Sequence, residues 1–152
     1  MSAAGGPPEV DAATERTTQL VELDRDECLR LLAATSLGRL AVNVQGWAPV
    51  IRPVNYVFDQ SSQSVVLRSA RGSKLTALVL SGQATFEIDG VESANQTGWS
   101  VIVTGVAEEI TNAPEIHRLE QLGLRPWAPG DRPHWIRIRS TVVSGRRIVT
   151  NR

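Results

Sequence analysis

The chain has 152 residues, of which 41% are hydrophobic and 21% are charged, and its 16 basic and 16 acidic residues give a formal net charge of zero. This is the composition of an ordinary soluble globular domain, and it excludes global disorder. The neutral balance also lacks the basic surface that nucleic acid or an anionic membrane requires, so we expect neither as a partner and expect any bound anion to be held locally.

The single cysteine, Cys28, excludes an internal disulfide, and its leucine-rich surroundings predict that it packs in the core. Residues 1–20 are rich in Ala, Gly, Pro and Thr and lack the basic and apolar parts of a secretory signal, so they are expected to form a flexible tail. Residues 21–152 are expected to be one domain. Because no apolar run is long enough to span a bilayer, a cytoplasmic protein is predicted.

The first structured elements are predicted to be a helix followed by three strands. Asp24 is placed to cap the helix, and Glu27, three positions later, to complete a capping box. The alternating stretches 39–44 and 48–58 are expected to pair as a hairpin, and a third short strand is expected at 64–69.

The second half of the chain continues this alternation of short helices and strands. Ser73 can cap a helix ending before Gly82. Asn112 can cap a further helix, whose first turn Pro114 fits. Trp127 lies in a proline-rich loop that it is expected to fix in place. The expected strands are 83–91, 97–111 and 135–149, and the expected loop is 125–133.

These expectations together give six strands with short connections, which predicts a mainly β, antiparallel barrel with short helices. The usual catalytic templates are missing from the sequence. His117 and His134 lie far apart with no cysteine or carboxylate at ligand spacing, so no metal site is expected. There is no G-x-S-x-G elbow, Walker loop or G-x-G-x-x-G fingerprint, so no catalytic side chain is assigned.

The segment 68–74 brings cations and hydroxyls to the point where a strand ends and a helix begins. Such a junction offers free backbone N–H groups, to which Arg71 and Lys74 add charge and Ser69 and Ser73 add donors. A few charge-assisted hydrogen bonds of this kind can hold a phosphomonoester without a basic surface. A solvated turn explains the segment equally well.

The segment 51–56 is an otherwise regular strand interrupted by Pro53, which cannot donate to a ladder. Proline there indicates an edge or a bulge, with backbone groups free to meet the edge of a flat heterocycle and Arg52 adding positive charge. A covered edge strand is an equal alternative.

In order and spacing, these stretches resemble the pyridoxamine 5'-phosphate oxidase-like family of FMN-binding split β-barrels, particularly its short bacterial branch of nitroimidazole-resistance-type proteins. The resemblance covers about residues 22–148. The stretches that carry it are 37–41, 52–56, 69–74, 99–105 and 144–148.

The resemblance implies that residues 52–56 lie along an isoalloxazine ring and that residues 69–74 hold its phosphate. It also implies a homodimer with two-fold symmetry, in which Trp99 and Ser100 reach the partner's cofactor. The cofactor-binding residues expected on this basis are Arg52, Pro53, Val54, Asn55, Ser69, Arg71, Ser73, Lys74, Trp99 and Ser100.

The function that follows is that of an FMN-dependent oxidoreductase, which transfers hydride at flavin N5 to a small-molecule acceptor. The chain is shorter than true pyridoxamine phosphate oxidases and lacks a recognisable substrate-phosphate cluster near its end, so vitamin B6 oxidation is not expected. Two alternatives remain open: an oxidoreductase of the same fold that uses the deazaflavin F420, and a flavin-binding sensor without turnover.

Overall fold

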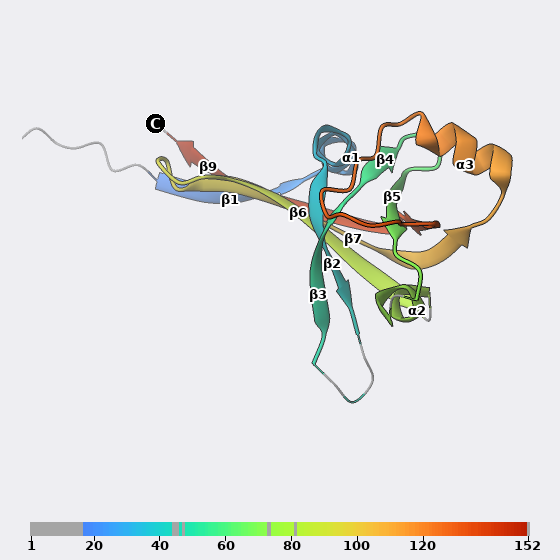
Figure 1. The fold of residues 1–152 in the computed structure, drawn as a ribbon. Coiled ribbons are helices and arrows are strands. Elements are labelled where there is room, and N and C mark those ends of the chain that lie inside the picture. The colour runs from blue at the N-terminus through green and yellow to red at the C-terminus, as the bar shows by residue number, and fades with distance from the viewer. Residues whose placement is uncertain (1–16, 44–45, 47, 73, 81, 152) are drawn as a thin grey trace, which may run out of the picture.

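The fold is one curled antiparallel sheet with three short helices packed around it (Figure 1). The computed structural model describes residues 17–151 except 44, 45, 47, 73 and 81, with the backbone alone at 74, 75 and 78. The elements of this part, in chain order, are β1 (Thr17–Leu23), α1 (Arg25–Ala34), β2 (Leu37–Val42), β3 (Val50–Asn55), β4 (Val57–Asp59), β5 (Ser64–Ser69), α2 (Lys74–Leu80), β6 (Gln83–Glu92), β7 (Thr97–Ile110), α3 (Ala113–Glu120), β8 (His134–Arg139) and β9 (Val142–Asn151).

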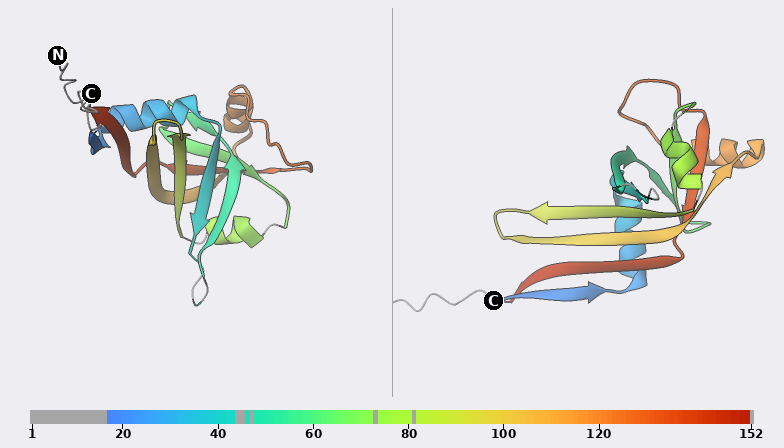
Figure 2. Two further views of the ribbon diagram at one scale, coloured as in Figure 1. Left: turned by 90° about the vertical axis from the view of Figure 1, so that its left-hand side faces the viewer. Right: turned by 90° about the horizontal axis from the view of Figure 1, so that it is seen from below.

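The sheet takes its shape from β7, the longest strand. It pairs along one edge with β6 and along the other with β9 and then β8. The order β3-β2-β6-β7-β8-β5-β4 therefore curls into an incomplete barrel, and β1 pairs with β9. Residues 17–22, 89–100 and 146–151 pair with one another and extend away from the barrel as a four-stranded arm (Figures 1 and 2).

β8 and β9 form one run along β7, interrupted by a bulge at Ser140 and Thr141. Ile138 lies opposite Ala107, but Val142 lies opposite Thr104, so the register shifts by one residue. Gly105 faces this bulge, and a Cβ there would overlap the carbonyl oxygen of Arg139. A bulge bends its strand, and this one lies where β7 exchanges its partner β9 for β8.

The hydrophobic core fills the inside of the curl. The Tyr56 ring meets the edge of Phe86 with 4.8 Å between centroids, and its hydroxyl donates to the Leu32 carbonyl at 2.7 Å. Phe86 in turn lies against Gly38, where any side chain would overlap its ring. Cys28 is fully buried in the same core, which confirms its predicted packing role. The other large side chains buried in this core are Leu32, Leu40, Ile88, Ile136 and Ile138, whereas Leu119 of α3 is buried in a second, smaller cluster.

The helix starts agree with the sequence in part. The Asp24 carboxylate accepts from the Glu27 N–H at 2.8 Å, as predicted, but the Glu27 carboxylate binds Arg30 and Arg147 instead of completing a capping box. Asn112 caps α3 by accepting from the Glu115 N–H at 3.0 Å. No described helix is long and apolar enough to cross a membrane.

The predicted mainly β, antiparallel fold is confirmed, but the strand count of six is too low for the part of the chain that is described. Residues 17–20, expected to belong to the tail, begin β1, and residues 1–16 lie outside the described part. The expected strand 48–58 is divided at Tyr56 into β3 and β4, and 135–149 is divided at the bulge into β8 and β9.

Candidate functional site

The barrel is interrupted between β3 and β5, and most of the expected site residues flank this interruption, which we call the split. β4 pairs with β5 from Val57 opposite Val66 to Asp59 opposite Ser64, whereas β3 pairs with β2. Among the described residues, no strand pairs with the other edge of β3 or with the matching edge of β5 beyond Val66. Unpaired strand edges present free backbone N–H and C=O groups.

The predicted position of Pro53 on an edge strand is confirmed, because β3 ends the strand order of the sheet. Arg52 lies opposite the fully buried Leu40, so Arg52 and Val54 share the face of β3 that is directed toward the inside of the curl. Pro53 and Asn55 share the opposite face. Arg52 and Pro53 are exposed, so none of the described residues covers their side chains.

The residues that follow β5 differ in how open they are. Arg71 and Gly72 are exposed, and Gly72 adopts a φ of +69°, which the turn requires and which glycine accepts without strain. The Ser69 hydroxyl is buried and shares a short hydrogen bond with the Thr76 hydroxyl of α2, so it is directed into the protein. Ser73 and the Lys74 side chain lie outside the described residues.

Trp99 and Ser100 lie on β7 at the base of the arm, and two strands, β2 and β6, separate β7 from β3 in the sheet. The half-buried Trp99 indole lies over Gly90 of the paired strand, where a Cβ would collide with the ring. Ser100 is on the other face of β7, opposite Arg146 of β9. In one chain, therefore, the expected residues form a group at the split and a separate pair on the arm.

Comparison with known proteins now identifies the fold. Residues 24–147 match the family model described as pyridoxamine 5'-phosphate oxidase. The chain belongs to this family. The uncharacterized protein Rv0080 of Mycobacterium tuberculosis is 34% identical over 145 residues, which cover 92% of this chain and 93% of that protein.

Solved structures place this family member among split barrels. An FAD binding protein from Mycobacterium smegmatis is 32% identical, with a TM-score of 0.71 over 84% of this chain and 98% of that one. A candidate 5-nitroimidazole antibiotic resistance protein from Bacteroides thetaiotaomicron shares 9% identity and a TM-score of 0.68 over 90% of this chain and 93% of that one, which shows the shared fold. The resemblance to the family is thus confirmed.

The outer face of the sheet holds a charged cluster that sequence reasoning missed. Arg39 of β2 lies 3.4 Å from the Asp89 carboxylate and 4.0 Å from the Glu87 carboxylate, both on β6. Burial and the neighbouring Asp89 raise the pKa of Glu87 to about 7. The alternation of two acids along a strand is the only signal in the sequence, and an ordinary solvated face gives the same pattern.

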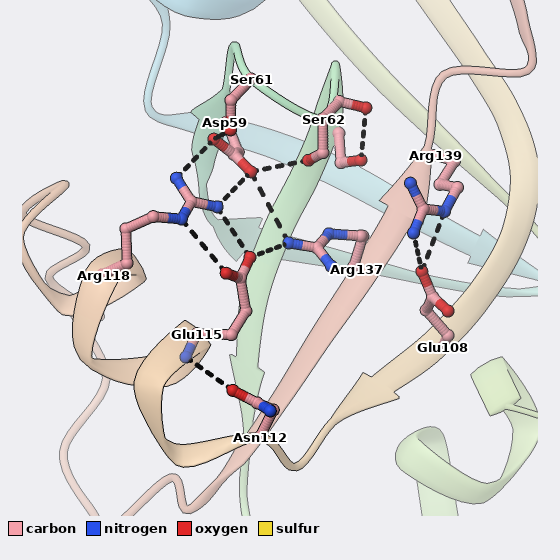
Figure 3. A network of polar contacts seen from close by, with 10 residues as sticks. Asp59, Ser61, Ser62, Glu108, Asn112, Glu115, Arg118, Arg137 and Arg139 are labelled. Carbon is pink, nitrogen blue, oxygen red and sulfur yellow. Dashed lines mark hydrogen bonds and ion pairs between the residues drawn. The ribbon is translucent and has the colours of Figure 1, made fainter.

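A second charged network, also missed, fastens α3 to the end of the barrel (Figure 3). The Asp59 carboxylate accepts from Arg118 at 2.8 and 3.1 Å, and Glu115 accepts from Arg137 at 2.6 Å and from Arg118 at 2.7 Å. These arginines hold the pKa of Asp59 well below its usual range and lower that of Glu115 to about 2. The network joins elements far apart in the sequence, and local patterns carry no sign of it.

The two histidines each lie beside a glutamate, in separate places. His134 Nδ1 lies 2.6 Å from the Glu109 carboxylate, and the exposed His117 lies 3.9 Å from Glu120. Within the described residues, no group of three or more His, Cys, Asp or Glu side chains is arranged to hold a metal ion. Both histidines contact glutamates and neither hydrogen bonds to Arg52 or Arg71 among the described contacts, so no role is assigned to them.

Proposed function

We propose that this family member binds a flavin at the split and works as a flavin-dependent oxidoreductase on a small-molecule acceptor. The observation that carries the proposal is the unpaired edge of β3 with the exposed cation Arg52, flanked in the barrel by the end of β5 with the exposed cation Arg71. Support also comes from the Mycobacterium smegmatis relative of the same fold, which binds FAD.

The residues at the split fit the two ends of a flavin nucleotide. The free edge of β3 offers backbone donors and acceptors to the pyrimidine end of the flavin ring. Arg52 adds a positive charge that favours negative charge on that end of the ring. Arg71 can donate charge-assisted hydrogen bonds to the phosphate, and Ser73 and Lys74 keep their assignment to the same phosphate from the sequence. The Ser69 hydroxyl is hydrogen-bonded to the Thr76 hydroxyl, so Ser69 would contribute to the phosphate site only by its position at the end of β5.

A bound flavin would supply two-electron chemistry by accepting or donating hydride at N5. The chain's own residues would bind and orient it, and no side-chain acid or base is assigned. A flavin-binding sensor without turnover needs the same residues. Anaerobic mixing with a nicotinamide donor separates the two functions, because an enzyme reduces its flavin much faster than free flavin is reduced under the same conditions.

FMN is the cofactor that we propose, with FAD and F420 as the alternatives that the same site could hold. The FAD-binding relative supports FAD, and a phosphodiester tail such as that of F420 would also suit Arg71. The absorption spectrum of the purified protein, followed by heat release and mass measurement of the chromophore, distinguishes the three. A colourless protein that binds none of them when they are added would refute the flavin proposal.

We also propose a homodimer formed through the outer face of the sheet. Ile51, Ile102, Val106 and Val142 lie on this face and are each between 39% and 62% exposed. The face also carries charges of both signs, because Arg39 lies beside Glu87. A second copy related by a two-fold axis can therefore present an opposite charge and an apolar side chain to each of these positions. The arm would then place Trp99 and Ser100 at the partner's split. Cytoplasmic location remains a prediction from the sequence.

A further inference from the structure

A pocket of about 390 Å³ lies beyond the end of β3, away from the residues assigned to the phosphate. Its walls are the end of α1, the corner between β3 and β4, and the loop that follows α3. The volume is within the range of small-molecule sites and is enough for one ring with a few substituents. The lining includes Ala33, Ala34, Asn55, Leu122, Arg125 and Trp127.

The Asn55 side chain provides one donor at this pocket that lacks an acceptor. Its Oδ1 accepts from the Trp127 backbone N–H at 2.9 Å, which fixes the amide so that Nδ2 is directed the other way. Nδ2 is closed off from water and has no hydrogen-bond partner among the described residues. Leaving such a donor unpaired costs about 1 to 3 kcal/mol, so an acceptor brought to this wall removes a penalty that the free protein carries.

The end of α1 provides acceptors at the same pocket. The last four carbonyls of a helix have no partner within it. The Leu31 carbonyl accepts from the Thr35 hydroxyl and the Leu32 carbonyl from the Tyr56 hydroxyl, at 2.8 and 2.7 Å. The other two belong to Ala33 and Ala34, which line the pocket, and no described side chain donates to them.

The mouth of the pocket is formed by exposed side chains of the loop. Trp127 is 73% exposed and Leu122 is 41% exposed, although both belong to residues that line the pocket. Trp127 is thus held to Asn55 by its backbone N–H, and its largely exposed ring is not what tethers the loop. A large apolar ring left open beside a polar pocket provides a flat surface for stacking, and Arg125 adds a positive charge at the rim.

We infer that this pocket binds a flat heteroaromatic ring carrying an amide edge, that is, a carbonyl oxygen beside an N–H. The oxygen accepts from Asn55 Nδ2, the N–H donates to the carbonyl of Ala33 or Ala34, and the ring stacks on Trp127. Because Nδ2 is covered in the free protein, the segment around Trp127 shifts to admit the ligand. The inference goes beyond the flavin proposal and does not need it, since it uses the side chain of Asn55 and no other residue assigned to the flavin.

The test uses the full-length protein, nicotinamide and uracil as probes, and benzoate as a flat ring that has the acceptor but no N–H. Ligand-detected NMR and Trp fluorescence follow the binding. Nicotinamide, uracil or both should bind and benzoate should not, and the tighter of the two amides indicates whether the natural ligand is a pyridine carboxamide or a pyrimidine. If benzoate binds as tightly as the amides, or if no probe binds, the inference is wrong.

Variants then locate the binding. Asn55→Ala should weaken probe affinity about tenfold, the equivalent of roughly 1.4 kcal/mol, and Trp127→Ala should weaken it and remove the fluorescence change. Asn95→Ala is the matched control, because Asn95 is an amide on the exposed β6–β7 turn, where it donates to Glu92. Trp127→Ala keeps the test decisive if Asn55→Ala does not fold, and unchanged affinity in a folded Trp127 variant overturns the proposal.

Competition with FMN separates this inference from the proposed function. If FMN binds and the probes still bind to the loaded protein, the pocket is a site of its own. If FMN displaces the probes, the pocket belongs to the flavin and the inference is wrong. If FMN does not bind but the probes do, the flavin proposal fails while the pocket remains.

Discussion

Replacing Asp59 with asparagine is expected to remove the centre of the network that holds α3 against the barrel. The Asp59 side chain is 3% exposed and accepts hydrogen bonds from Arg118 and from the hydroxyls of Ser61 and Ser62 (Figure 3). Arg137 lies 3.6 Å away and is itself only 10% exposed. Asparagine keeps the shape of the side chain but removes its charge, so the two arginines lose one of their two carboxylates.

The magnitude follows from how deeply each arginine is buried. Removing one partner from a buried ion pair costs about 3 to 5 kcal/mol, because an uncompensated charge stays inside. Arg118 is 42% exposed and can be hydrated, and Arg137 keeps Glu115 at 2.6 Å. Both facts reduce the cost, so Asp59→Asn should lower the free energy of unfolding by about 2 to 3 kcal/mol.

Urea unfolding followed by circular dichroism measures this loss, and its pH dependence tests the cause. The folded pKa of Asp59 is depressed from its ordinary 3.8, so its stabilisation is complete above that value and is lost as the pH falls below it. The gap between wild type and variant should therefore be constant near neutrality and close in acid. Glu108→Gln is the control, because Glu108 and Arg139 are both about half exposed and their pair contributes little. A change of less than about 0.5 kcal/mol in Asp59→Asn, no larger than for an ordinary surface substitution, would refute the reasoning.

Three further measurements test other parts of the molecule. The folded pKa of Glu87 is raised from 4.5 to about 7, so its contribution to stability falls as the pH rises through that interval; Glu87→Gln should flatten the urea midpoint across it, and an unchanged profile would show that Glu87 is freely solvated. Lys74→Ala should weaken flavin affinity by about 1.5 to 3 kcal/mol in a fluorescence titration, and equal affinity would remove Lys74 from the phosphate site. Val106→Asp should give a monomer in sedimentation experiments, because it places a charge in the proposed dimer face; a dimer of unchanged stability would assign that face to solvent.

The sequence predicted best what is decided within a few residues. The starts of α1 and α3 are set by Asp24 and Asn112, whose side chains bond to backbone N–H groups three positions later. Pro53 indicated an edge strand because its ring removes a donor from the chain itself. These predictions needed no knowledge of distant contacts, and the structure confirms them.

Features set by distant contacts could not be predicted in the same way. The bulge at Ser140 depends on the close approach of Gly105 across the strand pair, and a glycine in a β pattern alone does not specify a partner. The Asp59 network joins residues 59, 115, 118 and 137 only after the barrel has closed. The burial of the Ser69 hydroxyl against Thr76 likewise follows from how α2 packs, although the sequence places both among ordinary turn and helix residues.

The expected cofactor site shows that short motifs can name the residues of a site but not how the folded chains bring them together. Arg52 and Arg71 come from two separate stretches, next to the two strand edges that flank the split, and the resemblance names both without giving any distance between them. Trp99 belongs to the same resemblance, but within one chain β2 and β6 separate its strand, β7, from β3. If Trp99 contacts a flavin, the flavin is therefore held by a second copy, and the site is a property of the pair of chains. Composition, motif spacing and the fold of a single chain cannot predict that arrangement, because the two-fold axis of the proposed dimer relates two chains.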